Sequence, residues 1–195
     1  MKHLGFAMVA AMALCVCASA EAQSLTAPGF DFIEAVKKRD GNKATSMLDA
    51  QPAGIVNTKD ADGNTALLIA INRADEEWTG FLLNKGADPN IAGKGGETPL
   101  IAASRIGFEQ AVEWLLSVGA KVDGTNRMGE TPLIIAVQQR QIPIVRALLN
   151  AGANPDRTDA AAGFSARDYA TRDPRAREIL KMIDDKKPKA AAAAR

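Results

Sequence analysis

Paired carboxylates are the residues of this chain whose types and spacing first suggest chemistry. Asp60 and Asp62 lie in the stretch DADGN, and Glu76 and Glu77 are adjacent. Two carboxyl groups catalyse proton transfer only in a shielded pocket that separates their pKa values. We expect Asp60 and Asp62 on an exposed turn, and Glu76 and Glu77 at a helix start, where negative charge complements the helix dipole. The pattern favours structural roles over acid–base catalysis.

Two other stretches match ligand-binding loops only in part. DADGN, residues 60–64, begins like a calcium-binding loop, but the acidic ligand needed at its last position falls on Ile71. GKGGET, residues 93–98, is rich in glycine but lacks the lysine and hydroxyl spacing of a phosphate-binding loop. We therefore expect no catalytic residues, no cofactor and no metal site.

The N-terminal segment has the composition of a secretory signal peptide. In residues 1–22 a basic second residue precedes an apolar run from Leu4 to about Ala18, and small residues follow. The run is short for a membrane span. Cleavage is expected after Ala20 or Ala22, with an uncleaved anchor as the alternative. We expect a periplasmic or secreted protein without a membrane span after cleavage.

Removal of the signal peptide also removes residue types that often perform chemistry. The single histidine and both cysteines are His3, Cys15 and Cys17. The mature chain would then have no imidazole base, no thiolate and no Cys/His zinc site. The net charge of +1 argues against nucleic acid as a partner. Hydrophobic residues make up 47% of the chain and aromatic residues 5%, which indicates thin, helix-rich layers.

The elements that must position any site follow from an internal repeat. GETPLI occurs at Gly96–Ile101 and again 33 positions later, at Gly129–Ile134. Three rows align without a gap, at residues 60–92, 93–125 and 126–158. A fixed period of this length is typical of stacked supersecondary units.

Each row predicts the same turn followed by two helices. The glycines Gly63, Gly96 and Gly129 tolerate the positive φ of a tight turn. A threonine two residues later suits a helix N-cap, and in two rows a proline follows in the first helical turn. The second helix is expected to end at the glycine of a Gly-Ala pair. The predicted fold class is all-α, a solenoid of stacked helix–turn–helix units with projecting turns.

The two ends of this array are expected to differ from its centre. Residues 31–59 and 159–183 read as degenerate capping units, because each end of a stack faces water on one side. We assign residues 23–30 to a linker and residues 184–195 to a disordered tail.

The G-x-T-P-L motif, the Leu-Leu pairs and the Gly-Ala pairs resemble those of the ankyrin repeat, over about residues 31–183. This resemblance implies a curved stack that binds other proteins through a concave face, without enzyme activity or a cofactor. The histidine that usually follows T-P-L is absent, and apolar packing is expected to replace its polar link between units. At this aligned position the three rows have Leu68, Ile101 and Ile134.

The resemblance also implies which side chains face a partner, and both glutamates among them are expected to be free. In the turns these candidates are Lys59, Asp62, Asn64, Lys94, Glu97, Arg127, Met128 and Glu130. At the ends of the first helices they are Asn72, Arg73, Arg105, Ile106, Gln138 and Gln139. The tryptophans Trp78 and Trp114 are expected to pack between repeats.

We therefore expect a monomeric, non-enzymatic scaffold of the bacterial periplasm that binds another protein. One alternative is a dedicated stability or assembly factor for a single envelope enzyme. A less favoured alternative is an enzyme or small-molecule binder, which would need a closed pocket near Arg73 or Arg105.

Overall fold

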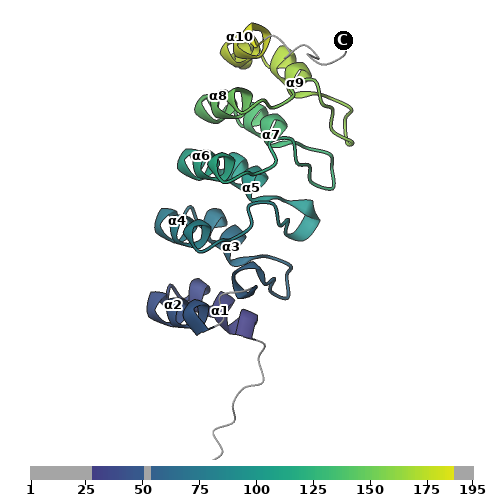
Figure 1. The fold of residues 1–195 in the computed structure, drawn as a ribbon. Helices are drawn as coiled ribbons and strands as arrows, with labels where there is room; N and C mark the ends of the chain where they lie inside the picture. Colours follow the sequence, from purple (N-terminus) through teal and green to yellow (C-terminus); the bar gives the residue numbers. More distant parts are fainter. Residues whose placement is uncertain (1–27, 51–53, 187–195) are drawn as a thin grey trace, which may run out of the picture.

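The computed structural model describes residues 28–50 and 54–186, which form helix pairs stacked along one axis and, within these ranges, no strand (Figure 1). The pairs are α1 (Pro28–Lys37) with α2 (Gly41–Ala50), α3 (Ala66–Asn72) with α4 (Glu76–Asn84), α5 (Pro99–Ile106) with α6 (Glu109–Ser117), α7 (Pro132–Gln138) with α8 (Ile142–Asn150), and α9 (Ala166–Arg172) with α10 (Arg177–Asp185). Short 3-10 turns lie at η1 (Ile55–Asn57), η2 (Lys94–Gly96) and η3 (Pro174–Ala176). The prediction of an all-α helix–turn–helix solenoid is confirmed.

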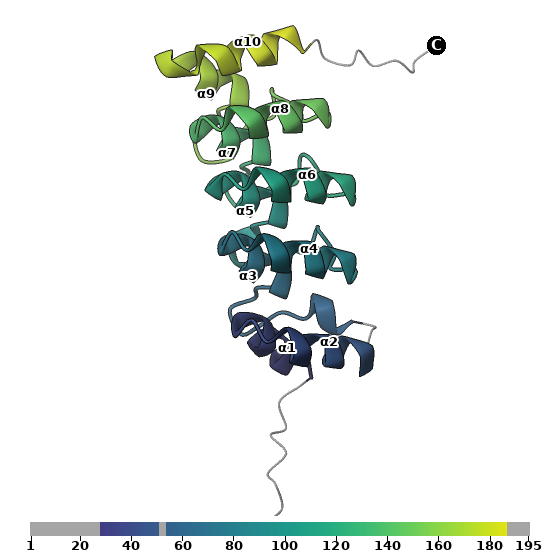
Figure 2. The ribbon, with the colours of Figure 1, turned by 90° about the vertical axis from the view of Figure 1, so that its left-hand side faces the viewer.

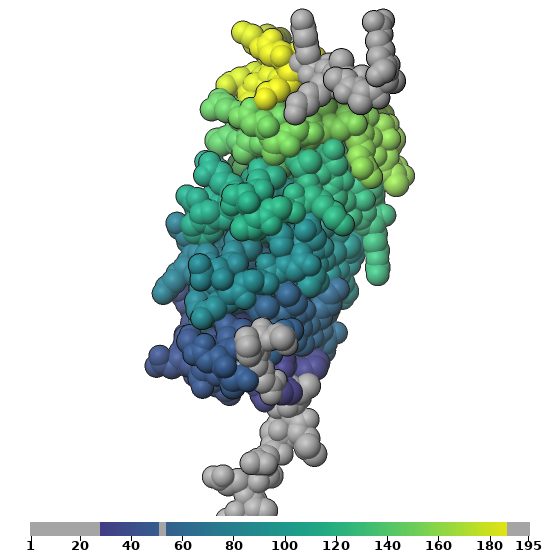
Figure 3. Space-filling model, in the orientation of Figure 1, coloured from purple at the N-terminus to yellow at the C-terminus, as the bar shows by residue number. Residues whose placement is uncertain are grey.

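The stack has three parallel rows of elements. In Figure 1 the second helices of each pair lie on one side, the first helices lie beside them, and the turns project from the opposite side. Figure 2 shows the same order after a quarter turn, with the first and second helices from α1 to α8 in separate columns. In the space-filling view of Figure 3 the units follow one another as bands along the long axis. Within the described residues, no helix has the length and apolarity needed to cross a membrane.

The threonine column caps the first helices as predicted. Thr65, Thr98 and Thr131 each accept a hydrogen bond from the backbone N–H three residues further on, at 3.3, 3.2 and 3.2 Å. In the terminal unit Ser165 takes this place and forms a reciprocal capping box with Asp168. These caps satisfy N–H groups that the helix itself leaves unbonded.

Left-handed residues end both helices of the three central pairs, from α3 to α8. Gly86, Gly119 and Gly152 end the second helices with φ of 84°, 91° and 90°, as predicted. The first helix α5 ends in the same way at Gly107, with φ of 77°. The first helices α1, α3 and α7 use Arg39, Ala74 and Arg140 at the equivalent turn, with φ of 58°, 51° and 53°.

Apolar packing between units forms the core. Leu68, Ile101 and Ile134 are buried, which agrees with the prediction that apolar contacts fill the column where histidine is usual. The prediction for Trp114 is also confirmed, because its ring lies against Gly80 of the preceding unit, where an added Cβ would come within 3.5 Å. Trp78 is buried and packs edge-on against Phe81, with ring centroids 5.4 Å apart.

A polar column joins each unit to the next on the side of the second helices. The side-chain oxygens of Asn57, Asn90 and Asp123 each accept a hydrogen bond from the backbone N–H 31 residues further along, at 2.8, 2.8 and 3.0 Å. The donor belongs to the next unit in all three cases. Each unit therefore helps to hold the loop of its neighbour.

The predicted boundaries need correction at both ends. Helix α1 begins at Pro28, inside the predicted linker 23–30, because Gly29 is buried and packs closely against Thr58. Helix α10 continues to Asp185, beyond the predicted end at residue 183, and its Asp184 forms an ion pair with Arg167 of α9. The predicted signal peptide and the rest of the predicted tail lie outside the described residues.

The terminal unit contains a buried carboxylate. Asp159 accepts hydrogen bonds from the Tyr169 hydroxyl at 2.6 Å and from the backbone N–H groups of Ala162 and Gly163 at 2.7 and 3.0 Å. Burial acts to raise the pKa of Asp159, but these hydrogen bonds outweigh it and leave the pKa below 3.8. The bond to Asp159, followed by burial, raises the pKa of Tyr169 above its ordinary value.

Replacing Ala74 with glycine is expected to stabilise the protein. Ala74 has φ of 51°, so its Cβ is strained in a conformation that glycine adopts freely. Relief of this strain should raise the free energy of unfolding by about 1 kcal/mol, measured by urea denaturation. The matched control is Ala151→Gly, where φ is −75° and no strain is relieved. A gain in the control equal to that of Ala74→Gly would contradict this explanation.

Replacing Tyr169 with phenylalanine should destabilise the protein in a pH-dependent way. A carboxyl whose folded-state pKa is lowered adds stability above its unfolded value of 3.8, and this stability is lost as pH falls through the folded value. Loss of the hydroxyl should lower the free energy of unfolding by about 1.5 kcal/mol at pH 7, with a smaller difference at pH 3. Urea denaturation at both pH values measures the two differences. Equal losses at both would show that the hydroxyl does not act through ionised Asp159.

Candidate functional site

The turns of the first and third rows are each shaped by the side chain at their first position. Asp60 Oδ1 accepts hydrogen bonds from the backbone N–H groups of Asp62 and Asn64 at 3.0 and 2.9 Å. Asn126 Oδ1 does the same for the third row, from Met128 and Glu130 at 2.9 and 3.0 Å. The sequence analysis did not predict this turn-closing role. The sign for it was the recurrence of Asp or Asn at the aligned positions 60, 126 and 159.

The second row has glycine at this aligned position for a steric reason. A Cβ on Gly93 would lie 2.8 Å from both Asn64 Oδ1 and Leu68 Cδ1 of the preceding unit. The glycine therefore permits close stacking of two neighbouring turns.

Asp60 is not exposed, contrary to our expectation. Its side chain is 7% exposed, and Oδ2 lies 3.3 Å from Lys37 Nζ in the preceding unit. Burial acts to raise the pKa of Asp60, but the backbone hydrogen bond from Asn64 and the bond and charge of Lys37 outweigh it, so the pKa is lowered. The hydrogen bonds and the ion pair of Asp60 thus stabilise its own turn and connect it to the preceding unit.

Direct hydrogen bonds join the tips of neighbouring turns. The backbone N–H of Arg127 donates to Gly95 O at 2.8 Å, and that of Ala160 donates to Met128 O at 2.8 Å. Between the first two rows, Lys59 Nζ donates to Ala92 O at 2.7 Å. The tips therefore form a continuous edge along the stack, visible at the side of Figure 1 opposite the second helices.

The ends of the first helices meet this edge and form one face with it. Arg105, at the end of α5, donates from Nε to Glu97 Oε1 at 2.9 Å, and its Nη2 lies 3.9 Å from Glu130 Oε2. Glu97 belongs to the same row as Arg105, whereas Glu130 belongs to the next. A single arginine thus connects a first helix to two turns.

Glu130 is not free to face a partner, and this part of the expectation is wrong. Its side chain is 12% exposed, and Oε2 also accepts a hydrogen bond from Asn126 Nδ2 at 2.6 Å. Glu97 is more exposed but is held by Arg105. Pairings of this kind depend on the distance between neighbouring turns, which the residue pattern of one row does not reveal.

We call the predicted partner-facing residues together the turn-and-helix face. Its exposed members are Lys59, Asp62, Asn72, Arg73, Lys94, Arg105, Ile106, Arg127, Met128 and Gln139. Its half-buried members are Asn64, Glu97, Glu130 and Gln138. Two of the exposed members are large and apolar, with Ile106 42% and Met128 51% exposed.

Two members of this face also bond to a neighbouring unit. Arg73 Nη1 donates to Lys37 O at 2.9 Å. Gln138 hydrogen-bonds with Tyr169 of the terminal unit. The face is therefore attached to the frame of the stack at several points along its length.

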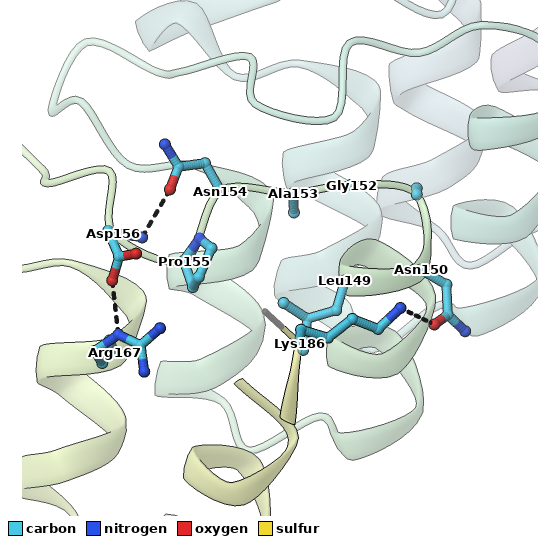
Figure 4. Close-up of a pocket in the computed structure, with 10 residues that line it drawn as sticks. Leu149, Asn150, Gly152, Ala153, Asn154, Pro155, Asp156, Arg167 and Lys186 are labelled. Carbon is cyan, nitrogen blue, oxygen red and sulfur yellow. Dashed lines mark hydrogen bonds and ion pairs between the residues drawn. The ribbon is translucent and has the colours of Figure 1, made fainter. Parts of the chain in front are cut away.

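A pocket of about 420 Å³ lies elsewhere, at the C-terminal end of the stack. It is lined by the loop after α8, by Arg167 and by Lys186, and neither Arg73 nor Arg105 borders it. Figure 4 shows that its polar groups bond to one another: Arg167 donates to Asp156, and Lys186 donates to the amide oxygen of Asn150. Across the described ranges, no cluster of three metal-binding side chains is present.

This pocket lies at the end of the series of hydrogen bonds that join the loops of successive units. Asp156 follows Asn57, Asn90 and Asp123 in that series, but it bonds to the Arg167 side chain at 2.7 Å instead of to a loop N–H. The loop after α8 is thus the last loop of the series, and the pocket occupies the space beside it.

Comparison with known proteins agrees with this architecture. The family model described as ankyrin repeats, in three copies, matches residues 75–159, from the N-cap of α4 to the first residue of the last turn. A search of curated proteins gave no match. A turn, a helix pair and a left-handed glycine recur in each central unit of the stack. Residues 75–159 of the chain are therefore ankyrin repeats, which are protein–protein interaction modules.

Proposed function

We propose that this protein is a non-enzymatic scaffold, exported to the bacterial periplasm or secreted, that binds another protein through the turn-and-helix face. The observation that carries the proposal is the pair of exposed apolar side chains on that face, Ile106 and Met128. Large apolar side chains that a polar surface surrounds are common anchors of protein interfaces.

The backbone that carries these anchors is already held in place. Met128 sits in a turn closed by Asn126, and its carbonyl oxygen bonds to Ala160 of the next turn. Ile106 is the last residue of α5, directly before the left-handed Gly107. A preformed surface loses little conformational entropy when it binds, which favours affinity.

Export is proposed from the sequence of residues 1–22, which lie outside the described part of the chain. Their short apolar run and small residues near Ala20 and Ala22 support a cleaved signal. The binding mechanism itself uses neither histidine nor cysteine.

Photo-crosslinking in living bacteria tests this proposal. A photoreactive residue in place of Ile106 or Met128 should capture a protein partner, and the adduct should be found in the periplasmic or secreted fraction. Mass spectrometry of the adduct should show a chain that lacks residues 1–20 or 1–22. Replacing Arg105, Ile106 and Met128 together should weaken binding to the captured partner.

The matched control is Val118, another large apolar residue, 48% exposed, at the end of α6 in the row of second helices. A photoreactive residue there should not capture the same partner. Capture at Val118 but not at Ile106 and Met128 would place the binding surface elsewhere. An adduct that retains Met1 would contradict export through a cleaved signal.

A further inference from the structure

The acidic groups of the turn-and-helix face are largely neutralised by the protein itself. Arg105 lies within 4 Å of carboxylate oxygens of both Glu97 and Glu130, and Lys37 neutralises Asp60 below the face. Asp62 is the acidic member of the face that is exposed and makes no ion pair within the described residues. The face therefore presents little net negative charge to a partner.

Four basic side chains of the face, in contrast, form no ion pair with any described residue: Lys59, Arg73, Lys94 and Arg127. Lys94 and Arg127 lie at the tips of the second and third turns and are exposed. The Arg127 backbone N–H donates to Gly95 O, next to Lys94, so the two turn tips adjoin. Lys59 and Arg73 each donate to a backbone carbonyl oxygen rather than to a carboxylate.

The second helices of the first two rows, α4 and α6, have the opposite charge. The exposed side chains of α4 and α6 include Glu76, Glu77, Glu109 and Glu113. The net charge of +1 for the whole chain hides this separation of charge between the two sides. An asymmetric charge distribution orients a charged partner before contact and disfavours the wrong face.

The apolar anchors lie among the basic side chains. Met128 directly follows Arg127 in the third turn, and Ile106 directly follows Arg105 at the end of α5. A complementary ligand must therefore offer carboxylates and apolar side chains in close alternation.

We propose that the turn-and-helix face recognises an acidic segment of its protein partner that carries apolar side chains between its carboxylates. This inference rests on the proposed function and specifies the chemistry of the partner. Carboxylates of the partner pair with Lys94, Arg127 and Arg73, and its apolar side chains contact Ile106 and Met128. Lysine and arginine at adjoining turn tips suit such a segment because their side chains donate several hydrogen bonds to carboxylate oxygens.

The test uses two labelled synthetic peptides and fluorescence anisotropy. One peptide is built from glutamate and leucine, and the other has every glutamate replaced with glutamine. The wild-type chain should bind the glutamate peptide about tenfold or more tightly at low ionic strength, since each surface ion pair contributes about 0.5 kcal/mol or more. The preference should shrink in high salt.

Charge reversal locates the interaction on the protein. The double variant Lys94→Glu with Arg127→Glu should lose about tenfold in affinity for the glutamate peptide. The matched control is Lys121→Glu with Arg146→Glu, which makes the same charge change at exposed positions on α8 and on the loop after α6. With both variants measured at about 0.1 M salt, this control should lose less than about twofold, because charges beyond a Debye length of about 10 Å are largely screened. Equal affinity for both peptides, or equal losses in both variants, would overturn the inference.

The captured partner separates this inference from the proposed function. If the segment crosslinked at Ile106 and Met128 lacks Asp and Glu, and its binding survives Lys94→Glu with Arg127→Glu, the acidic partner is wrong and the scaffold function stands. If neither position captures a protein, the scaffold function fails, whatever the peptides show.

Discussion

The packing of each helix pair against its neighbours is the constraint on which the rest of this structure depends. One pair of short helices cannot bury its own apolar surface, so the unit is stable only within a stack. The buried column of Leu68, Ile101 and Ile134 meets this need in the central units. Because the same residues recur at the same spacing, every turn leaves the stack on the same side.

This arrangement connects packing to binding. Side chains that stabilise the turns, such as Asp60 and Asn126, point back into their own turns and leave the tips to carry Lys94, Arg127 and Met128. Hydrogen bonds between adjacent tips keep these side chains in register along the face. The backbone of this surface is therefore held in place by hydrogen bonds, whereas its exposed side chains differ from one row to the next. This combination suits a protein-binding module.

The features that repeat were predictable from the sequence, because each results from local chemistry. The glycines at positive φ, the Thr N-caps and the Gly-Ala helix ends each depend on a few adjacent residues. Ile106 and Met128 are exposed, as their positions in the repeat predicted.

The interactions that cross between units were not predictable in this way. The Arg105 ion pairs, the burial of Glu130 and the Lys37–Asp60 pair depend on how closely successive turns approach. The start of α1 at Pro28 was missed because Gly29 packs against Thr58, far away in the sequence. Asparagine or aspartate at the first position of three turns was a local sign of their role. The pattern was hard to recognise because the second row has glycine at that position.

The central claim is that the turn-and-helix face, and not the row of second helices, binds the partner. Hydrogen–deuterium exchange of the free chain and of its complex with the captured partner tests this claim directly. We predict slower exchange on binding in the second and third turns, residues 91–98 and 124–131, and at the ends of α5 and α7. Protection confined to α4, α6 and α8, with the turns unchanged, would contradict the account.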